Sequence, residues 1–462
     1  SNFSGTIPAG VTQASNESTL NGTADSGIAP RVGFAWKALP NSDRIVLRGG
    51  YGVYYSRYTG QAQSQTTTTQ PFGQLRIISG PSDSTATWAS PFRPPVPTPA
   101  TYPAFFPYTP SSTASQNAVD PSLRPGFVEE YSMNIQTQLG RDFLLETGFV
   151  GTRGTRLLRI RSVNEAMLAS VSDPIRGVTT NTVGNVQSRV PYQGWSAASL
   201  QQVESAGAMW YNGLEVSLTK RFSSGLQFLA SYTWSKTLDT DGANVVQNSG
   251  AGTAIGEQNN DRQRYGPASF SRPQRFIVSY VYELPWLKAS KGLVHTALAG
   301  WSVAGVTTFQ SGQPLTILST NTNNVYGITS TSGDRAQLAP GCTYPQIGTA
   351  GSVTSRILSY FNTGCFTKAP VIGSDGVGTG FGNSGVGIVR GPAQNNFDIS
   401  LAKQFPMYRD RVALQFRAEF FNTFNTPQFA SPDTTFTDAA FGQVTATSVS
   451  PRLIQLALKV VF

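Results

Sequence analysis

The sequence is poor in the residues on which most catalytic and metal sites depend. Its 462 residues include one histidine, His295, and two cysteines, Cys342 and Cys365. One histidine cannot build a histidine-based metal cluster, and two cysteines without nearby histidine do not complete the four ligands of a zinc site. We therefore expect no enzyme activity, no metal site and no cofactor. His295 is interpreted as a solvated turn residue.

Long apolar runs are also lacking. No segment approaches the ~18 consecutive apolar residues of a membrane-spanning helix, and the mean hydropathy is -0.18. This excludes a helical membrane protein. It does not exclude a membrane β-barrel, whose lipid-facing residues occupy every second position and average out against the polar residues between them.

Positive charge is present but is not concentrated. The net charge is +9 and the pI is near 9.5, yet lysine and arginine are scattered and form no basic run. No aromatic-rich RNA-binding signature accompanies them. We predict no nucleic-acid partner, and we interpret the charge as a solvated surface or a lumen lining.

What the chain does contain is glycine, proline and alternating strand patterns. With 46 glycines, 29 prolines and 11% aromatic residues, it suits many strands joined by turns. Period-two alternation of apolar and polar residues recurs in eleven segments. They are residues 31–38, 44–55, 130–139, 143–151, 213–222, 226–235, 275–285, 300–312, 397–405, 411–424 and 451–462.

The connections between these segments alternate strictly between short and long. Outer-membrane barrels have short periplasmic turns and long external loops, so the alternation predicts an antiparallel transmembrane β-barrel. If the last strand runs towards the periplasm, the first must also start outside. Residues 1–30 would then form an external loop segment and residues 31–462 a partial barrel. Bacterial single-chain barrels have even strand numbers, so eleven strands predict half of a 22-stranded barrel and further strands upstream.

The C-terminal strand has the pattern with which such barrels end. Ile454, Leu456, Leu458 and Val460 form an apolar row that finishes at the aromatic Phe462. We expect this row to face the lipid of the outer membrane, and the segment to act as a signal to the barrel assembly machinery. The alternative is a half-buried strand of a soluble sandwich.

Polar residues that alternate with apolar ones are candidates for the lumen wall. Gln415, Arg417 and Glu419 share one row of their strand, and Glu130, Asn134 and Gln136 share a row of another. They could contact a substrate or a plug. The simpler interpretation is a ladder of lumen side chains whose charges pair across strands.

The remaining motifs are weak. Cys342 and Cys365 lie in a region rich in glycine, threonine and asparagine, which we interpret as a long loop. One local disulfide could form there in an oxidising compartment; the alternative is two free thiols. The G-x-G-x-x-G spacing at residues 380–385 lacks the strand and helix of a phosphate-binding loop. Asp239, Asp241 and Asn244 match only the start of a calcium loop.

Several segments in consistent order resemble the Oar-like group of TonB-dependent outer-membrane transporters. They include PRVGFAW, SYTWSKTLD, YVYELPW, GWSVAGVTTFQSGQPLTI, YFNTGCFTKAP and the C-terminal stretch from FRAEFFNTF to LALKVVF. The resemblance implies an outer-membrane receptor that takes up a ligand and carries an N-terminal plug that contacts TonB. This sequence shows no plug, TonB box or signal peptide, so the resemblance covers the second half of the barrel.

The sequence thus predicts the barrel portion of a TonB-dependent transporter. Its ligand could be an oligosaccharide, a peptide or a metal chelate, because no loop carries a recognisable site. The alternative is a secreted β-rich binding module or adhesin that recognises glycans or surfaces. An outer-membrane hydrolase is a third hypothesis, without a convincing nucleophile and base.

Overall fold

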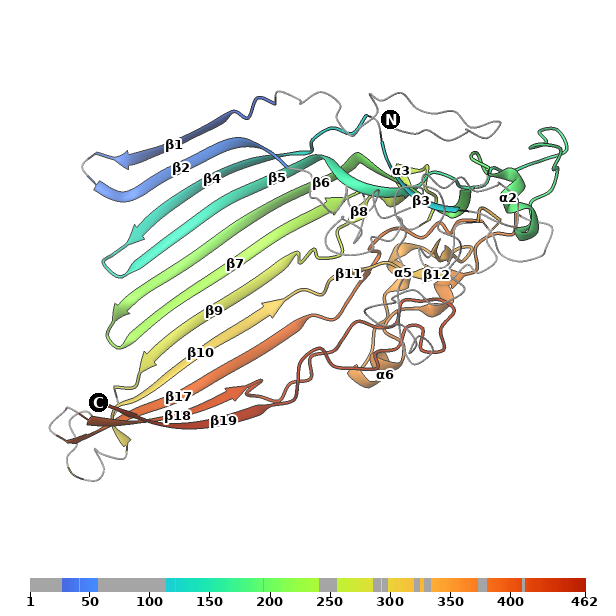
Figure 1. Ribbon diagram of the computed structural model, residues 1–462. Coiled ribbons are helices and arrows are strands. Elements are labelled where there is room, and N and C mark those ends of the chain that lie inside the picture. The colour runs from blue at the N-terminus through green and yellow to red at the C-terminus, as the bar shows by residue number, and fades with distance from the viewer. Residues whose placement is uncertain are drawn as a thin grey trace, which may run out of the picture.

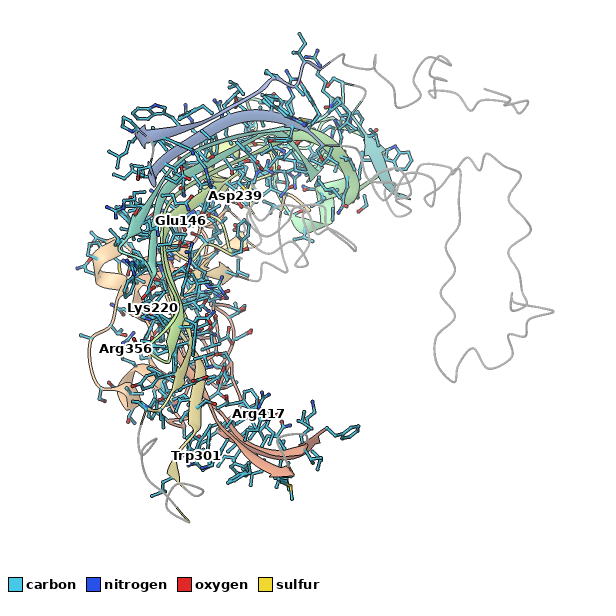
Figure 2. The ribbon with its side chains drawn as sticks, turned by 90° about the vertical axis from the view of Figure 1, so that its left-hand side faces the viewer. Glu146, Lys220, Asp239, Trp301, Arg356 and Arg417 are labelled. Atoms are coloured by element: carbon cyan, nitrogen blue, oxygen red, sulfur yellow. A yellow bond between two sulfur atoms is a disulfide. The ribbon has the colours of Figure 1, made fainter. Side chains whose placement is uncertain are left out.

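One curved antiparallel sheet dominates the computed structural model, which describes residues 27–40, 42–56, 114–120, 122–193, 195–240, 256–285, 292, 298–319, 325–327, 334–372, 380–408 and 412–462. The sheet forms an open half-cylinder (Figures 1 and 2). Eleven of its strands follow one another in chain order, each paired antiparallel with the next. They are β1 (Arg31–Leu39), β2 (Ser42–Tyr55), β4 (Phe127–Leu139), β5 (Phe143–Ser162), β6 (Trp195–Ser223), β7 (Leu226–Asp239), β9 (Gln274–Glu283), β10 (Trp301–Gln310), β17 (Gln394–Tyr408), β18 (Val412–Phe421) and β19 (Leu453–Val461). The predicted order of eleven strands is confirmed.

Short and long connections lie at opposite ends of this sheet (Figure 1). The links after β1, β4, β6, β9 and β17 are the shorter ones and lie at one end, which we call the turn end. The links after β2, β5, β7, β10 and β18 are long and gather at the other, the loop end. The C-terminus lies at the turn end.

The hairpin between β6 and β7 shows how the sequence sets a tight turn. Ser223 pairs with Leu226, leaving Ser224 and Gly225 as a two-residue loop. Their φ angles are 52° and 79°, as a type I′ turn requires. The twist of this turn matches the twist of the two strands, which fixes their register.

Two strands are longer than the sequence pattern predicts. The sequence predicts strands over residues 143–151 and 213–222, whereas β5 continues to Ser162 and β6 begins at Trp195. These extensions lie at the loop end, where their polar side chains pack against loops. A strand that does not face lipid needs no apolar residue at every second position. Buried Ile160 and Val203 pack together there. The short strands β3 (Ala114–Val119) and β8 (Gly266–Pro267) pair with β6 and β7 at the same end.

The longest connection, after β10, folds into a packed unit that we call the loop module (residues 311–319, 325–327, 334–372 and 380–393). It contains three two-stranded pairs and two short helices. They are β11 (Pro314–Leu315) with β16 (Val389–Arg390), β12 (Leu318–Ser319) with β13 (Asp334–Arg335), β14 (Gln337–Leu338) with β15 (Phe366–Thr367), α5 (Tyr344–Ile347) and α6 (Val353–Leu358). The 3-10 turn η4 (Thr363–Cys365) precedes β15.

The main hydrophobic core lies in this module, not in the sheet. Ile317, Ala336 and Phe361 are almost completely buried in it. Phe436 and Phe441 from the β18–β19 connection pack against the same core. The segment expected to be only a long loop is therefore a folded unit.

Further single-turn helices lie in the other long connections. They are η3 (Val183–Asn185), α2 (Val186–Arg189) and α3 (Asp261–Arg264). Within the described ranges, no helix is long and apolar enough to cross a membrane. His295, Asp241, Asn244 and most of the predicted segment 1–30 lie outside those ranges.

Candidate functional site

The register of the sheet sorts alternate residues into an apolar face and a polar face. Residues directly opposite each other on paired strands point to the same side. One such row contains Trp36, Leu47, Ile135, Thr147, Val216, Tyr232 and Phe276. Another contains Phe228, Tyr280, Gly305, Ile399, Phe420 and Ile454. Together these rows give all eleven strands one apolar face.

The opposite face carries the polar residues. A row of directly paired positions runs through Arg48, Asn134, Gly148, Glu215, Thr233, Arg275, Gln310 and Gln394. Figure 2 looks along the half-cylinder from the turn end, with Arg417 on its concave side. Because Arg417 belongs to the polar face, that face lines the hollow of the sheet.

The six polar residues predicted to line the lumen lie on this polar face. Asn134 pairs with Arg48, Gln136 with Glu146 and Glu130 with Thr152. Gln415, Arg417 and Glu419 lie opposite Lys459, Ala457 and Gln455. Arg417 Nη1 lies 3.4 Å from Glu419 Oε1, an ion pair along the strand.

The predicted C-terminal row lies on the apolar face. Ile454, Leu456, Leu458 and Val460 pair with Phe420, Ala418, Phe416 and Leu414. Their exposed fractions are 52%, 67%, 66% and 52%, so no protein core covers them. Phe462, just after β19, is 97% exposed.

At the loop end, a buried charge network joins three segments distant in sequence. Arg159 of β5 donates from Nε to Glu204 Oε1 of β6 at 2.6 Å, and from Nη1 to Asp261 Oδ1 of α3 at 2.9 Å. Arg161 also donates to both oxygens of Glu204, at 3.1 and 3.2 Å, and to Asn259. A buried carboxylate shared by two guanidinium groups satisfies its lone pairs without water. This network holds the β7–β9 connection against β5 and β6. These two strands belong to the eleven-stranded sheet, which we call the wall.

Glu165 lies beside this network as a buried carboxyl group with a raised pKa. It is 8% exposed, and Asn259 Nδ2 donates to its Oε2 at 3.4 Å. Burial, together with the negative charge of Glu257, raises the pKa of Glu165 to about 7. This carboxyl group therefore changes charge near neutral pH.

The loop module contains a second buried carboxylate, next to an arginine that contacts the β7–β9 connection. Asp334 is 2% exposed, and burial raises its pKa to about 6. Its oxygens accept from the backbone N–H groups of Gly382 and Arg335, at 2.9 and 2.7 Å. The side chain of Arg335 donates to the backbone and side-chain oxygens of Gln263. The β10–β17 and β7–β9 connections are thereby held together.

The loop module also contains a disulfide. Cys342 and Cys365 are bonded, with their Cα atoms 5.5 Å apart and 23 positions apart in sequence. Cys365 belongs to the buried core of the module and Cys342 packs against it. The bond closes the segment that contains α5 and α6.

Comparison with known families identifies the architecture. Residues 2–455 match the family model described as an outer membrane beta barrel domain, which covers almost the whole chain. The chain belongs to this outer membrane β-barrel family. It is a protein of the bacterial outer membrane, with its apolar face against lipid and its long loops outside.

Solved structures similar to this barrel share little sequence with it. The outer membrane transporter YddB from Escherichia coli matches with a TM-score of 0.46 and 9% identity, over 94% of this chain and 40% of that chain. BauA, the ferric preacinetobactin receptor from Acinetobacter baumannii, has a TM-score of 0.36 and 11% identity, over 93% and 36%. The FrpB iron transporter from Neisseria meningitidis has a TM-score of 0.37 and 10% identity, over 94% and 39%.

The barrel chain therefore spans about 40% or less of the length of these structures. No curated protein matches it at a significant level. Membership of the outer-membrane family decides against a secreted soluble module.

The loop-end network is the part of the barrel that sequence reasoning missed. Arg159 and Arg161 alternate with the buried Ile160, which is itself a strand signal. The polar composition hid that signal, because strands were recognised by their apolar rows.

Within the described residues, no group of three or more His, Cys, Asp or Glu is placed to hold a metal ion.

Proposed function

We propose that this barrel is part of a TonB-dependent receptor that takes up a ligand across the outer membrane, and that it belongs to the Oar-like group. The observation that carries the proposal is the polar face of a half-cylinder of eleven consecutive strands, half the strand number of the 22-stranded plugged transporters. The ordered segments resembling the Oar-like group support the same class.

The two edges of the sheet support a barrel completed by further strands. Among the described residues, β1 and β19 each pair on one side only. In hydrocarbon, a free strand edge leaves backbone N–H and C=O groups unpaired, at several kcal/mol for each group. We propose that other strands of the same receptor close the barrel, and that a plug within it contacts TonB.

The role of this part is passive. Its strands would hold the lumen open, its outer loops would capture the ligand, and the plug would gate passage. Insertion would use the barrel assembly machinery, with the β19 row and Phe462 as the signal. No catalytic step is assigned to any residue.

Uptake in living cells tests this proposal. A strain lacking the receptor and the same strain complemented with it would be given a labelled oligosaccharide, a labelled oligopeptide and a radioactive ferric chelate. We expect receptor-dependent accumulation of one probe, abolished by an uncoupler or by deletion of TonB. Accumulation that persists without TonB would indicate an open channel and contradict the proposal.

A further inference from the structure

A cavity at the loop end lies between α6 and the ends of β9, β10 and β17. Its volume is about 520 Å³, within the range of small-molecule sites. Pro273 precedes β9, Gly312 follows β10, and Ala393 precedes β17. Arg356 of α6 and Arg390 of β16 contribute the charged side chains.

The charged side chains among the described residues that line this cavity are all positive. Among the described residues that line it, none is Asp or Glu. A neighbouring cavity of about 600 Å³ shares Pro273 and Arg390, adds Lys236, and also has no acidic residue among its described lining. Positive groups from the wall, from α6 and from β16 therefore gather without a carboxylate.

Arg272, which acts electrostatically on Arg390, and its neighbour Arg275 add positive charge near this cavity, although neither of them lines it. Burial and the like charge of Arg275 lower the pKa of Arg272, and burial and the like charge of Arg272 lower the pKa of Arg390. Within the described part of the chain, no salt bridge involves Arg272, Arg275, Arg356 or Arg390. Among the described residues, no carboxylate within salt-bridge distance therefore offsets the repulsion between Arg272 and Arg390.

The arginines keep donors available for a ligand. Arg390 donates from Nη1 to the Gly312 carbonyl at 3.4 Å, and Arg272 donates from Nη2 to Gln313 Oε1 at 3.3 Å. These are single, long contacts, whereas a guanidinium group has five N–H donors. A planar carboxylate or a phosphate is the group that such donors bind best.

Most of the remaining cavity lining is apolar. Val353, Ile357, Phe429 and Val444 line it, together with the ring of Tyr360. The Arg356 guanidinium lies 5.2 Å from the centre of that ring, which orients it. A ligand that fills this space needs a compact apolar body as well as an anionic group.

We propose that this cavity binds an organic anion, in which a carboxylate or phosphate is joined to a compact apolar body. The inference rests on the proposed function, since this site would be where the receptor captures its ligand from outside. Arg356 and Arg390 hold the anionic group. The apolar wall holds the body.

Equilibrium binding to the receptor in detergent micelles, with all segments of its natural chain, tests the site. The probes are 2-naphthoate and its neutral analogue 2-naphthamide. We expect naphthoate to bind more tightly, and its binding to weaken as salt rises, because screening reduces charge attraction. Arg356→Gln and Arg390→Gln should each weaken naphthoate binding roughly tenfold and leave naphthamide unchanged.

Arg221→Gln is the matched control, because Arg221 is an exposed arginine at the turn end. It removes the same charge and should leave binding unchanged. The cavity variants should keep or raise the thermal unfolding temperature, since they relieve repulsion. If Arg390→Gln lowers both the unfolding temperature and naphthoate binding, that variant does not separate folding from binding. The Arg356→Gln variant then tests the site, because Arg356 is exposed. Equal binding of naphthoate by the Arg356→Gln variant and the unchanged protein overturns the proposal.

A second arm separates a free solute from a lipid headgroup as the source of the anion. In nanodiscs, phosphatidylglycerol should not displace naphthoate relative to phosphatidylcholine; displacement assigns the site to lipid and overturns ligand capture. Binding does not require uptake, so the two proposals fail separately. Uptake without arginine-dependent binding overturns only the site, and binding without uptake overturns only the transport function.

Discussion

Which medium a side chain meets depends on the parity of its position in a strand. Leu456 and Gln455 are neighbours in β19, yet the first lies opposite Ala418 on the apolar face and the second opposite Glu419 on the polar face. One step along the chain therefore changes the surroundings from hydrocarbon to the lumen. The effect of a new charge should differ accordingly.

Leu456→Arg should destabilise the barrel by about 2–4 kcal/mol, the cost of an arginine on the lipid face near the bilayer midplane. Gln455→Arg is the control and should cost much less, because its side chain points into the hollow. Urea unfolding in lipid vesicles measures both. Equal losses in the two variants would mean that the apolar face does not meet lipid.

Burial of Glu165 makes stability at the loop end depend on pH. Its pKa rises from 4.5 to about 7 in the folded protein, so the folded state holds a proton that the unfolded chain releases. Stability is then highest below about pH 4.5 and falls as pH rises towards 7. Above about pH 7, this loss in the free energy of unfolding amounts to about 3 kcal/mol.

Glu165→Gln removes that titration. We expect the variant to match the unchanged protein at pH 5 within a small margin, and to unfold at higher temperature at pH 8. Thermal unfolding between pH 4.5 and 8 measures the difference. Glu283→Gln, at an exposed carboxylate of the turn end, is the control and should leave the pH dependence unaltered. An unchanged slope in Glu165→Gln would show that Glu165 is not the responsible group.

At the scale of elements, the wall and the loops are stabilised by different forces. The membrane strands are held by their hydrogen-bonded ladders, whereas the loop module has a buried core and a disulfide. The Arg159–Asp261 contact joins the strands to the β7–β9 connection, and the Arg335–Gln263 contacts join that connection to the loop module. Damage to the module should therefore leave the strands intact.

Replacing both Cys342 and Cys365 by serine tests this separation. Closing a loop of this length contributes about 3 kcal/mol in the chain-entropy description. We expect faster protease cleavage within residues 334–372, while the strands remain protected in the membrane. Mass spectrometry of the fragments measures this. Simultaneous cleavage of strand segments would show that module and barrel unfold as one unit.

At the scale of the molecule, the half-cylinder has two free edges. Since β1 and β19 lie at opposite ends of the strand order, the ladder does not close on itself among the described residues. A membrane barrel needs closure because lipid offers no hydrogen bonds to an open edge.

The chain alone, refolded in detergent, should therefore aggregate or give no uniform pore. Co-refolding with further strands of its receptor should yield a monomeric species with a discrete conductance. Size-exclusion chromatography and planar-bilayer recording measure the two outcomes. A stable pore of uniform conductance from the isolated chain would contradict the need for other strands.

The sequence by itself determined the strands and their order. Alternation in segments such as LIQLALKVV, and the contrast between short and long links, depend only on the period of a strand and on the two media it separates. Both faces of β18 and β19 follow from that period. The local pattern was sufficient to predict these strands, because every strand in a membrane must place apolar side chains towards lipid at alternate positions.

Only the tertiary structure decided what the loops do. Arg159, Glu204 and Asp261 meet across distant segments, and Arg356 and Arg390 line one cavity in the same way. No period in the sequence encodes such meetings, since they depend on how separate connections pack at the loop end. The membrane-spanning wall is specified by local pattern, and the candidate ligand site by long-range packing.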